Sequence, residues 1–444
     1  MIENYEVVIV GGGISGLACA RRLTELGMTS FRLITENIGG RLPTSADGKV
    51  NYGAFYVRSD YRHVLPFVRC TRPFNVTHAM FFHQGQALSF LNWRNLWHLP
   101  SLLRFLYFLR QFRREYEQFR RETETVSQKQ ALESHPWLKR LMREPAVELV
   151  TRFGIQYWAD RFLDNLVRAT TFIDIRHISS CYFAAVCLPI IMRTYEFEFQ
   201  RDRLTDPFSS LIERDTVTGI GTGCERRWRI TTAGGRQLEA NHVVVATPLN
   251  RSQQLVPITE PVNPATSVFM FHVRGQLKPA YHGRSMYFFP PESSDIVMVH
   301  EPDKTCLFYS QSMTPDLGAY FEHHAVIFQK HWDPALFLGP HVLESDRGEG
   351  LYLIGDHSVC SLEDAYITGL FAANRICGHS EKNGGVAQTC FERLGGGAIR
   401  GLTEDRCLGE SSRISFLLFL CHPDIQRDVW ATPSDRVLQR RPAA

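Results

Sequence analysis

Three glycines separate an unbroken apolar run from a helix-forming stretch near the start of the chain. The segment VVIVGGGISGLACARRL places Gly11, Gly13 and Gly16 in the spacing GxGxxG, with Ile14 and Ser15 between the last two. Between a strand and a helix, the first glycine permits a tight turn, the second lets the backbone approach a diphosphate, and the third lets helix and strand pack closely. The positive helix N-terminus favours an anion. The segment therefore predicts a site for the diphosphate of a nucleotide.

An acidic residue follows at the distance that a ribose site requires. Glu36 lies 20 positions beyond Gly16, at the end of a second predicted strand over residues 31–34. A carboxylate at this point accepts hydrogen bonds from ribose hydroxyls and repels a 2′-phosphate, so NADP is disfavoured while NAD and FAD both fit. A glycine-rich turn without a ligand is the plain alternative. The strand, helix and acid in register favour the nucleotide.

Composition and charge exclude several other classes of protein. The chain has 444 residues, of which 44% are hydrophobic and 21% charged, as in ordinary globular proteins. A net charge of +3 is too small for a dedicated nucleic-acid binder. Eleven cysteines occur singly, with no CxxC pair, so we expect no disulfide framework and no metal site. With neither a signal peptide nor an apolar run long enough to cross a bilayer, the expected location is cytoplasmic.

The order of the predicted elements places the glycine turn in a strand–helix–strand unit. Residues 61–195 have mainly helical periodicity, and strand patterns return between residues 216 and 309, including a hairpin at residues 228–245. Residues 318–330 are predicted as a helix, and residues 350–376 as a strand, a turn and a helix. The sequence therefore predicts an α/β protein with a second, antiparallel sheet.

A second glycine turn follows the acid at once. In ENIGGR, Gly40 precedes Arg41, whose guanidinium can bind the same diphosphate. Here the sequence resembles the flavin-containing amine oxidase superfamily, which includes monoamine oxidases, protoporphyrinogen oxidase and carotenoid desaturases and has a GGR motif at this point. Four further segments are similar to the family's motifs and follow in its order: DTVTGI, ANHVVVATPLN, HWDPALFLGP and GLYLIGDHSVCSLEDAYITGLFAANRI.

The resemblance implies FAD as the cofactor and assigns roles along these motifs. Val217 meets the adenine through its backbone, and Gly355 and Asp356 approach the ribityl and diphosphate groups. Leu362 and Glu363 lie near the isoalloxazine.

The chain also departs from the family's pattern. Only Asn37-Ile38 separates the ribose acid from GGR, Asn51 replaces an aspartate, and Thr368-Gly369 replaces Ser-Gly. There is no SGGC segment like that of the covalently flavinylated monoamine oxidases, although Cys360 follows Asp356. We therefore expect FAD to be bound non-covalently.

The family's architecture also implies how the chain divides. It predicts a discontinuous Rossmann-type FAD-binding domain over residues 1–60, 205–250 and 340–380. Residues 61–204 and 251–339 would form an α+β substrate domain with a helical part and an antiparallel sheet. Residues 381–444 are an appendage of uncertain structure.

Catalytic residues are harder to identify. Trp332 in HWDPALFLGP is implied near the flavin ring, although aromatic side chains dominate cores anyway. Tyr309 is a weaker candidate. Lys330 lies in the predicted helix, and the alternative to a catalytic role is an ordinary surface lysine.

The implied activity is dehydrogenation of a C–N or C–C bond of a small organic substrate. The substrate would be apolar or amine-bearing, with dioxygen or a quinone-like acceptor, since no second nucleotide motif exists for a nicotinamide. An FAD-assisted isomerisation without net oxidation and an inactive FAD-binding scaffold are the alternatives. The substrate and the oligomeric state do not follow from the sequence.

One predicted helix raises a further possibility. Residues 95–122, NLWHLPSLLRFLYFLRQFRREYEQFRRE, combine apolar residues with six arginines after Pro100. A basic amphipathic helix can lie on an anionic membrane surface. The alternatives are a domain helix whose arginines form a solvated face paired with Glu115, Glu117 and Glu122, or a surface for an acidic partner.

Overall fold

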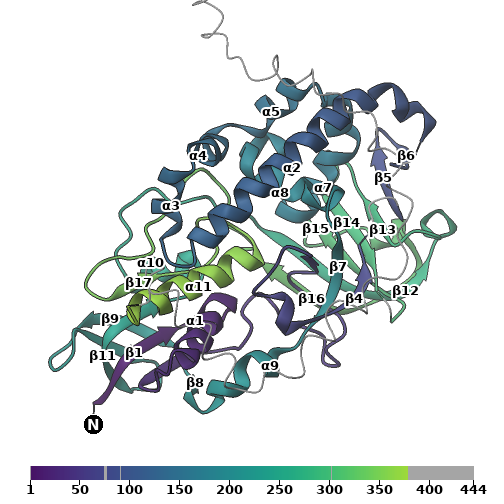
Figure 1. Cartoon of the computed structure of the whole chain (residues 1–444). Helices are drawn as coiled ribbons and strands as arrows, with labels where there is room; N and C mark the ends of the chain where they lie inside the picture. The colour runs from purple at the N-terminus through teal and green to yellow at the C-terminus, as the bar shows by residue number, and fades with distance from the viewer. Residues whose placement is uncertain (1, 75–77, 91, 302, 379–444) are drawn as a thin grey trace, which may run out of the picture. The chain divides into compact units, whose positions relative to one another are not determined.

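A computed structural model of the chain describes residues 2–74, 78–90, 92–301 and 303–378 (Figure 1). The chain separates into two compact units, residues 1–381 and 382–444, and the described residues belong to the first. The expectation of an appendage over residues 381–444 lies outside the described residues.

A seven-stranded sheet carries the glycine turn. Its strand order is β8 (Ile212–Arg214), β2 (Phe31–Thr35), β1 (Glu3–Val10), β11 (Gln237–Val245), β10 (Trp228–Thr232) and β9 (Val217–Thr222), and β17 (Leu351–Leu353) also pairs with β11. The pairs around β1 and β11 are parallel except for that with β10. Buried apolar runs such as Val7–Val10 suit strands that are covered on both faces. The predicted Rossmann-type sheet is confirmed.

Two helices pack together beside this sheet. Helix α1 (Ile14–Glu25) follows β1, and α11 (Leu362–Ile376) follows β17 and lies against α1 (Figure 1). The approach is close because Gly369 has no side chain: a Cβ there would lie 2.2 Å from the Ser15 carbonyl oxygen. The two motifs that open and close the fold therefore meet in space.

A second seven-stranded sheet and a small three-stranded sheet complete the β structure. The second sheet has the order β16 (Phe321–Trp332), β12 (Val268–Leu277), β15 (Thr305–Ser310), β14 (Asp295–His300), β13 (Met286–Phe288), β5 (Ala79–His83) and β6 (Gln86–Leu88). It is antiparallel except between β13 and β5. The small sheet contains β3 (Tyr56–Arg58), β7 (Thr194–Phe199) and β4 (Val68–Pro73).

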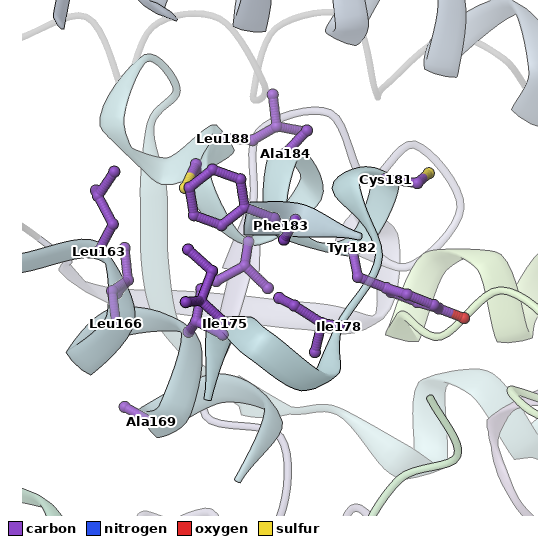
Figure 2. Close-up of a cluster of buried hydrophobic side chains, with 14 of the residues drawn as sticks. Leu163, Leu166, Ala169, Ile175, Ile178, Cys181, Tyr182, Phe183, Ala184 and Leu188 are labelled. Carbon is purple, nitrogen blue, oxygen red and sulfur yellow. The ribbon is translucent and has the colours of Figure 1, made fainter. Parts of the chain in front are cut away.

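Most of the helices lie between β6 and β7 in the sequence. They include η3 (Trp93–His98), α2 (Leu99–Glu122), α3 (Gln128–Ser134), α4 (Pro136–Arg143), α5 (Ala146–Phe153), α6 (Gln156–Trp158), η4 (Ala159–Leu163), α7 (Asp164–Thr171) and α8 (Ser180–Cys187). Figure 2 shows how Leu166, Ile178 and Phe183 gather in their shared core, while Tyr182 points sideways toward the closing segment. The Tyr182 hydroxyl donates to the Ser358 carbonyl at 2.7 Å, which joins this core to that segment.

One prediction about these elements was wrong. Residues 318–330 were predicted as a helix, but the short turn η9 (Leu317–Ala319) leads into the strand β16, which pairs along its length with β12. The run Ala325–Phe328 is rich in residues that favour strands, and strand pairing overrides the weak helical pattern. The largely helical stretch expected over residues 61–195 also contains β4, β5 and β6.

Candidate functional site

The glycine turn after β1 is held against the neighbouring strands. Gly11 has φ +111° and donates its amide to the Ile34 carbonyl at 2.9 Å. A Cβ at Gly11 would lie 2.8 Å from the Ala246 carbonyl oxygen, and one at Gly16 would lie 2.0 Å from the Gly11 carbonyl oxygen. Both positions therefore need glycine for packing within the protein.

Gly13 is different, because a Cβ there would meet no atom within 4 Å. Gly13 is also the N-cap of α1, and no side chain caps this helix end. Ile14 and Ser15 form the first turn, which has no acidic residue. The open space and the free helix N-terminus together form a site that suits a diphosphate.

The second glycine turn packs directly on the first. The Gly39 amide donates to the Gly12 carbonyl at 2.8 Å, and a Cβ at Gly40 would lie 2.9 Å from the Gly13 Cα. Because Gly40 has φ +56°, only glycine fits here without strain. The turn brings Arg41 to the same region.

Arg41 forms a salt bridge with Asp356, which follows Gly355 in the closing motif. Arg41 Nη1 also donates to the Ala335 carbonyl at 2.7 Å. Burial raises the pKa of the Asp356 carboxyl, but the charge and the hydrogen bond of Arg41, with smaller contributions from His357 and the backbone, together outweigh burial. The pKa therefore lies below its usual value and Asp356 is ionised. Gly355 has φ +138° and its amide donates to Thr368 Oγ1 at 3.0 Å. The structure thus brings four of the predicted cofactor residues, Gly40, Arg41, Gly355 and Asp356, together.

Glu36 and Val217 lie at the predicted ribose and adenine end. Glu36 is exposed just beyond β2, and its Oε1 accepts a hydrogen bond from Thr216 Oγ1 at 2.9 Å. Val217 follows as the buried first residue of β9, and its carbonyl accepts from Arg251 Nη2 at 3.1 Å. The acid and the strand are therefore neighbours, although they are far apart in the sequence.

Leu362 and Glu363 open α11, and their contacts are with the protein. Glu363 is buried, and its two carboxylate oxygens accept the amides of His63 at 2.9 Å and Val64 at 3.1 Å. Leu362 is partly buried against the core beside α1. Both residues stay predictions as flavin contacts.

The three catalytic candidates lie on one face of the second sheet. Tyr309 and Lys330 both pair with Met270 of β12, from opposite sides, and Trp332 is two residues beyond Lys330 on β16. Residues directly opposite each other in a sheet, and residues two apart in a strand, share a face. Trp332 Nε1 donates to the Tyr52 carbonyl at 3.0 Å, and Lys330 Nζ lies 5.2 Å from the centroid of the Trp332 ring.

Tyr309 and Lys330 differ in burial. The Tyr309 hydroxyl is buried and has no hydrogen-bond partner in the described part of the chain. Lys330 is exposed on the edge strand. A buried hydroxyl without a hydrogen-bond partner is costly. Of the three candidates, Tyr309 is therefore the one to which a bound group would supply the missing hydrogen bond.

The structure contains a buried network of charged side chains that the sequence patterns did not predict. Arg120 donates to both carboxylate oxygens of Asp364 at 2.9 and 2.8 Å and to Asp60 at 3.0 Å, and Arg58 donates to Asp60 twice at 3.0 Å. The Tyr116 hydroxyl donates to Asp364 at 2.7 Å. The network fixes the first turn of α11 to α2 and to the end of β3.

The spacing of the buried residues in α2 indicates that Arg120 belongs to the buried face of this helix. Arg120 lies on the same face as Phe105, Leu109, Phe112 and Tyr116, all buried, at helical spacing. The expectation that the arginines of α2 form one solvated face is wrong at Arg120. It is right at Arg113, which pairs with Glu117 at 2.7 Å, whereas Glu115 and Glu122 bind His135.

A surface depression beside Asn51 contains an acidic pair. It is lined by Asn51, Phe55, Glu196, Phe197 and Glu301, among others. Burial, and then the neighbouring Glu196, raise the pKa of Glu301 to about 8. In the described residues, no group of histidine, cysteine and acidic side chains could hold a metal ion.

Comparisons with known proteins support the fold. A model of the NAD(P)-binding Rossmann-like domain matches residues 9–71. A 69-residue stretch is 39% identical to flavin-containing amine oxidase B of Bos taurus; it covers 15% of this chain and only 13% of that protein.

Solved structures match over most of the chain. A putrescine oxidase bound to putrescine has a TM-score of 0.60 at 12% identity and covers 85% of this chain and 100% of its own. A cyclohexylamine oxidase from Brevibacterium oxydans has a TM-score of 0.57 at 14% identity, with coverage of 84% and 98%. The resemblance to the flavin-containing amine oxidases is therefore confirmed at the level of the fold.

Proposed function

We propose that this chain, which shares its fold with flavin-containing amine oxidases, is an FAD-dependent oxidoreductase. It dehydrogenates a C–N or C–C bond of a small organic substrate that is apolar or carries an amine, and passes the electrons to dioxygen or a quinone-like acceptor. The observation that carries the proposal is the open space at Gly13 beside an uncapped helix N-terminus.

The residues around this space fit FAD. The backbone of Gly11–Gly16 and the first turn of α1 would hold the diphosphate, and Glu36 would accept hydrogen bonds from the adenosine ribose. Arg41 supplies a positive charge whose present partner is Asp356. When bound, the flavin accepts two electrons from the substrate, and the protein positions both.

The second sheet would supply the wall against which the substrate is held. Its face with Trp332 and Tyr309 continues into a buried apolar core that contains Val268 and Met270. An apolar wall excludes water, which favours transfer of electrons to the intended acceptor. Tyr309 can orient a polar group through its free hydroxyl.

The chemistry of Cys360 supports non-covalent binding of the cofactor. Its Sγ lies 3.7 Å from Asp356 Oδ2. Burial, together with the nearby Asp356 charge, raises the thiol pKa well above its usual value, so the nucleophilic thiolate is disfavoured. Within the described residues no two cysteines form a disulfide, which suits the proposed cytoplasmic location.

Reduction of the bound flavin tests the proposal. The purified protein should be yellow, and a substrate from a panel of amines, amino acids and polyenes should bleach it without oxygen. Readmission of air should restore the colour and release hydrogen peroxide if dioxygen is the acceptor. A yellow protein that converts a substrate to its isomer without net oxidation would favour the isomerase, and a folded, colourless protein that takes up no FAD would favour the scaffold.

A further inference from the structure

A long segment before and within α2 contains no acidic residue. From Tyr61 to Arg114 the chain has eight arginines and neither aspartate nor glutamate. The first acid after it is Glu115 in the middle of α2. Four of these arginines pair with acids from outside the stretch: Arg62, Arg69, Arg72 and Arg113. The stretch therefore creates a positive potential only where its other arginines reach the surface.

The turn η3, which leads into α2, displays large apolar side chains to solvent. Trp97 is 84% exposed, Trp93 70% and Leu96 64%, and Tyr107 on α2 is 46% exposed. Scattered single exposed apolar residues are normal, but neighbouring ones on one turn mark an interaction surface.

Buried hydrogen bonds and a ring contact fix the turn η3, which carries these exposed side chains. Asn95 is buried within η3; its Nδ2 donates to the Phe90 carbonyl at 2.7 Å, and its Oδ1 accepts from the Tyr157 hydroxyl at 2.7 Å. The His98 ring stacks on Tyr157 at 3.6 Å, and its carbonyl accepts from Trp158 Nε1 at 2.9 Å. The tryptophans are therefore exposed by a well-anchored turn.

Four exposed arginines follow these side chains along η3 and α2. Arg94, Arg104, Arg110 and Arg114 are exposed, and among the described residues none of them forms a salt bridge. Arg104, Tyr107, Arg110 and Arg114 follow one another at spacings of three and four along α2, so they continue one face of the helix.

We propose that this surface, made by η3 and the first half of α2, docks on an anionic lipid bilayer. Tryptophan and tyrosine side chains favour the interface between lipid headgroups and acyl chains, and arginines beside them bind anionic headgroups. The absence of acids removes the repulsion that a negatively charged surface would meet. No helix in the described residues is long and apolar enough to span the membrane.

The opposite end of α2 touches the closing motif. Arg120 binds Asp364 in α11, so one helix of 24 residues, about 36 Å long, joins the docking surface to the proposed cofactor site. The docking surface goes beyond the proposed function and does not depend on it, because vesicle binding is measured without substrate.

Sedimentation of the full chain with vesicles tests the proposal. With phosphatidylserine–phosphatidylcholine vesicles the protein should sediment and its tryptophan emission should shift to the blue, and both effects should fall as salt rises. Arg104→Gln and Arg110→Gln should each lower the partition coefficient about fivefold. Trp93→Ala/Trp97→Ala should abolish the emission shift.

Matched variants separate docking from other effects. Lys304→Gln and Met313→Ala change exposed residues elsewhere and should bind as the wild type does. Failure of the folded wild-type chain to bind anionic vesicles, or equal binding to pure phosphatidylcholine, would overturn the proposal. So would a dimer that Trp97→Ala dissociates, since a second copy would then cover the surface.

Discussion

Arg41 and Asp356 form a salt bridge although 315 residues separate them in the sequence. The pair joins the second glycine turn to the turn after β17, on the side of the fold where Gly13 leaves open space. Arg41 holds Asp356 ionised, and an incoming diphosphate would offer Arg41 a second anionic partner. The positive charge that the proposed cofactor would need is therefore already positioned by Asp356.

Gly13→Ala and Gly16→Ala should separate binding from folding. At Gly13 the new methyl group meets open space and φ is −72°, so stability should fall by less than about 1 kcal/mol. The methyl group would enter the proposed diphosphate site, and FAD affinity should fall at least about tenfold. At Gly16 the methyl group meets the Gly11 carbonyl at 2.0 Å and should cost about 3 kcal/mol of stability. Urea unfolding and FAD titration measure both, and unchanged affinity in a folded Gly13→Ala variant would contradict the assignment.

Glu36→Ala should weaken retention of FAD by about tenfold or more, because hydrogen bonds to a charged group contribute about 1.5–3 kcal/mol. The ratio of FAD to protein after extensive dialysis measures this loss. Glu148→Ala, which removes an exposed carboxylate from α5, is the control and should keep its flavin. Equal flavin content in the two variants would argue against Glu36 as the ribose ligand.

Arg120→Met should lower the free energy of unfolding by about 3–5 kcal/mol, because it leaves Asp60 and Asp364 buried with fewer partners. Arg121→Met, at the next position, changes an exposed residue and should cost less than about 0.5 kcal/mol. Urea denaturation of both variants gives the comparison. Similar losses would mean that the network around Asp364 contributes little to the fold.

Glu301→Gln should stabilise the protein at pH 8 and have little effect at pH 5. Burial is the main reason that the pKa of Glu301 rises from 4.5 to about 8. The charges of Glu196 and Asp303 also raise this pKa, and the charge of Arg72 opposes the rise. Between these values the folded state keeps a proton that the unfolded state has lost, so wild-type stability falls as pH rises, by at most about 1.4 kcal/mol per pH unit.

The difference in unfolding free energy between Glu301→Gln and wild type should therefore grow across pH 5–8. Glu322→Gln, on the exposed strand β16, should follow the wild type at each pH. A difference that stays constant with pH would show that Glu301 ionises in the folded protein as it does in the unfolded chain.

The strands around the glycine turn could be predicted closely from the sequence. The continuous apolar run that ends at Gly11 identified β1, because a strand buried on both faces has no polar face to confuse the pattern. The glycines of the hairpin turn, Gly234 and Gly235, identified β10 and β11. β16 could not be predicted, since it is exposed along most of its length and its sequence lacks both alternation and a clear helical stripe. Only its pairing with β12 decides its structure.

The candidate site was predictable where one motif contains all its parts. The glycine spacing and Glu36 followed from local rules, whereas the proximity of Arg41 to Asp356 depended on the resemblance to a family. The burial of Arg120 was not foreseen, because an arginine in a basic helix is ordinarily solvated. Its partners Asp60 and Asp364 are supplied by segments far from it in the chain.

A crystal structure of the chain grown with FAD would show whether the diphosphate binds at the start of α1. We expect an extended dinucleotide whose diphosphate lies within hydrogen-bond distance of the backbone amides there, with Gly13 facing it. Continuous density for FAD elsewhere, or side chains that fill the space beside Gly13 in the presence of excess FAD, would contradict it.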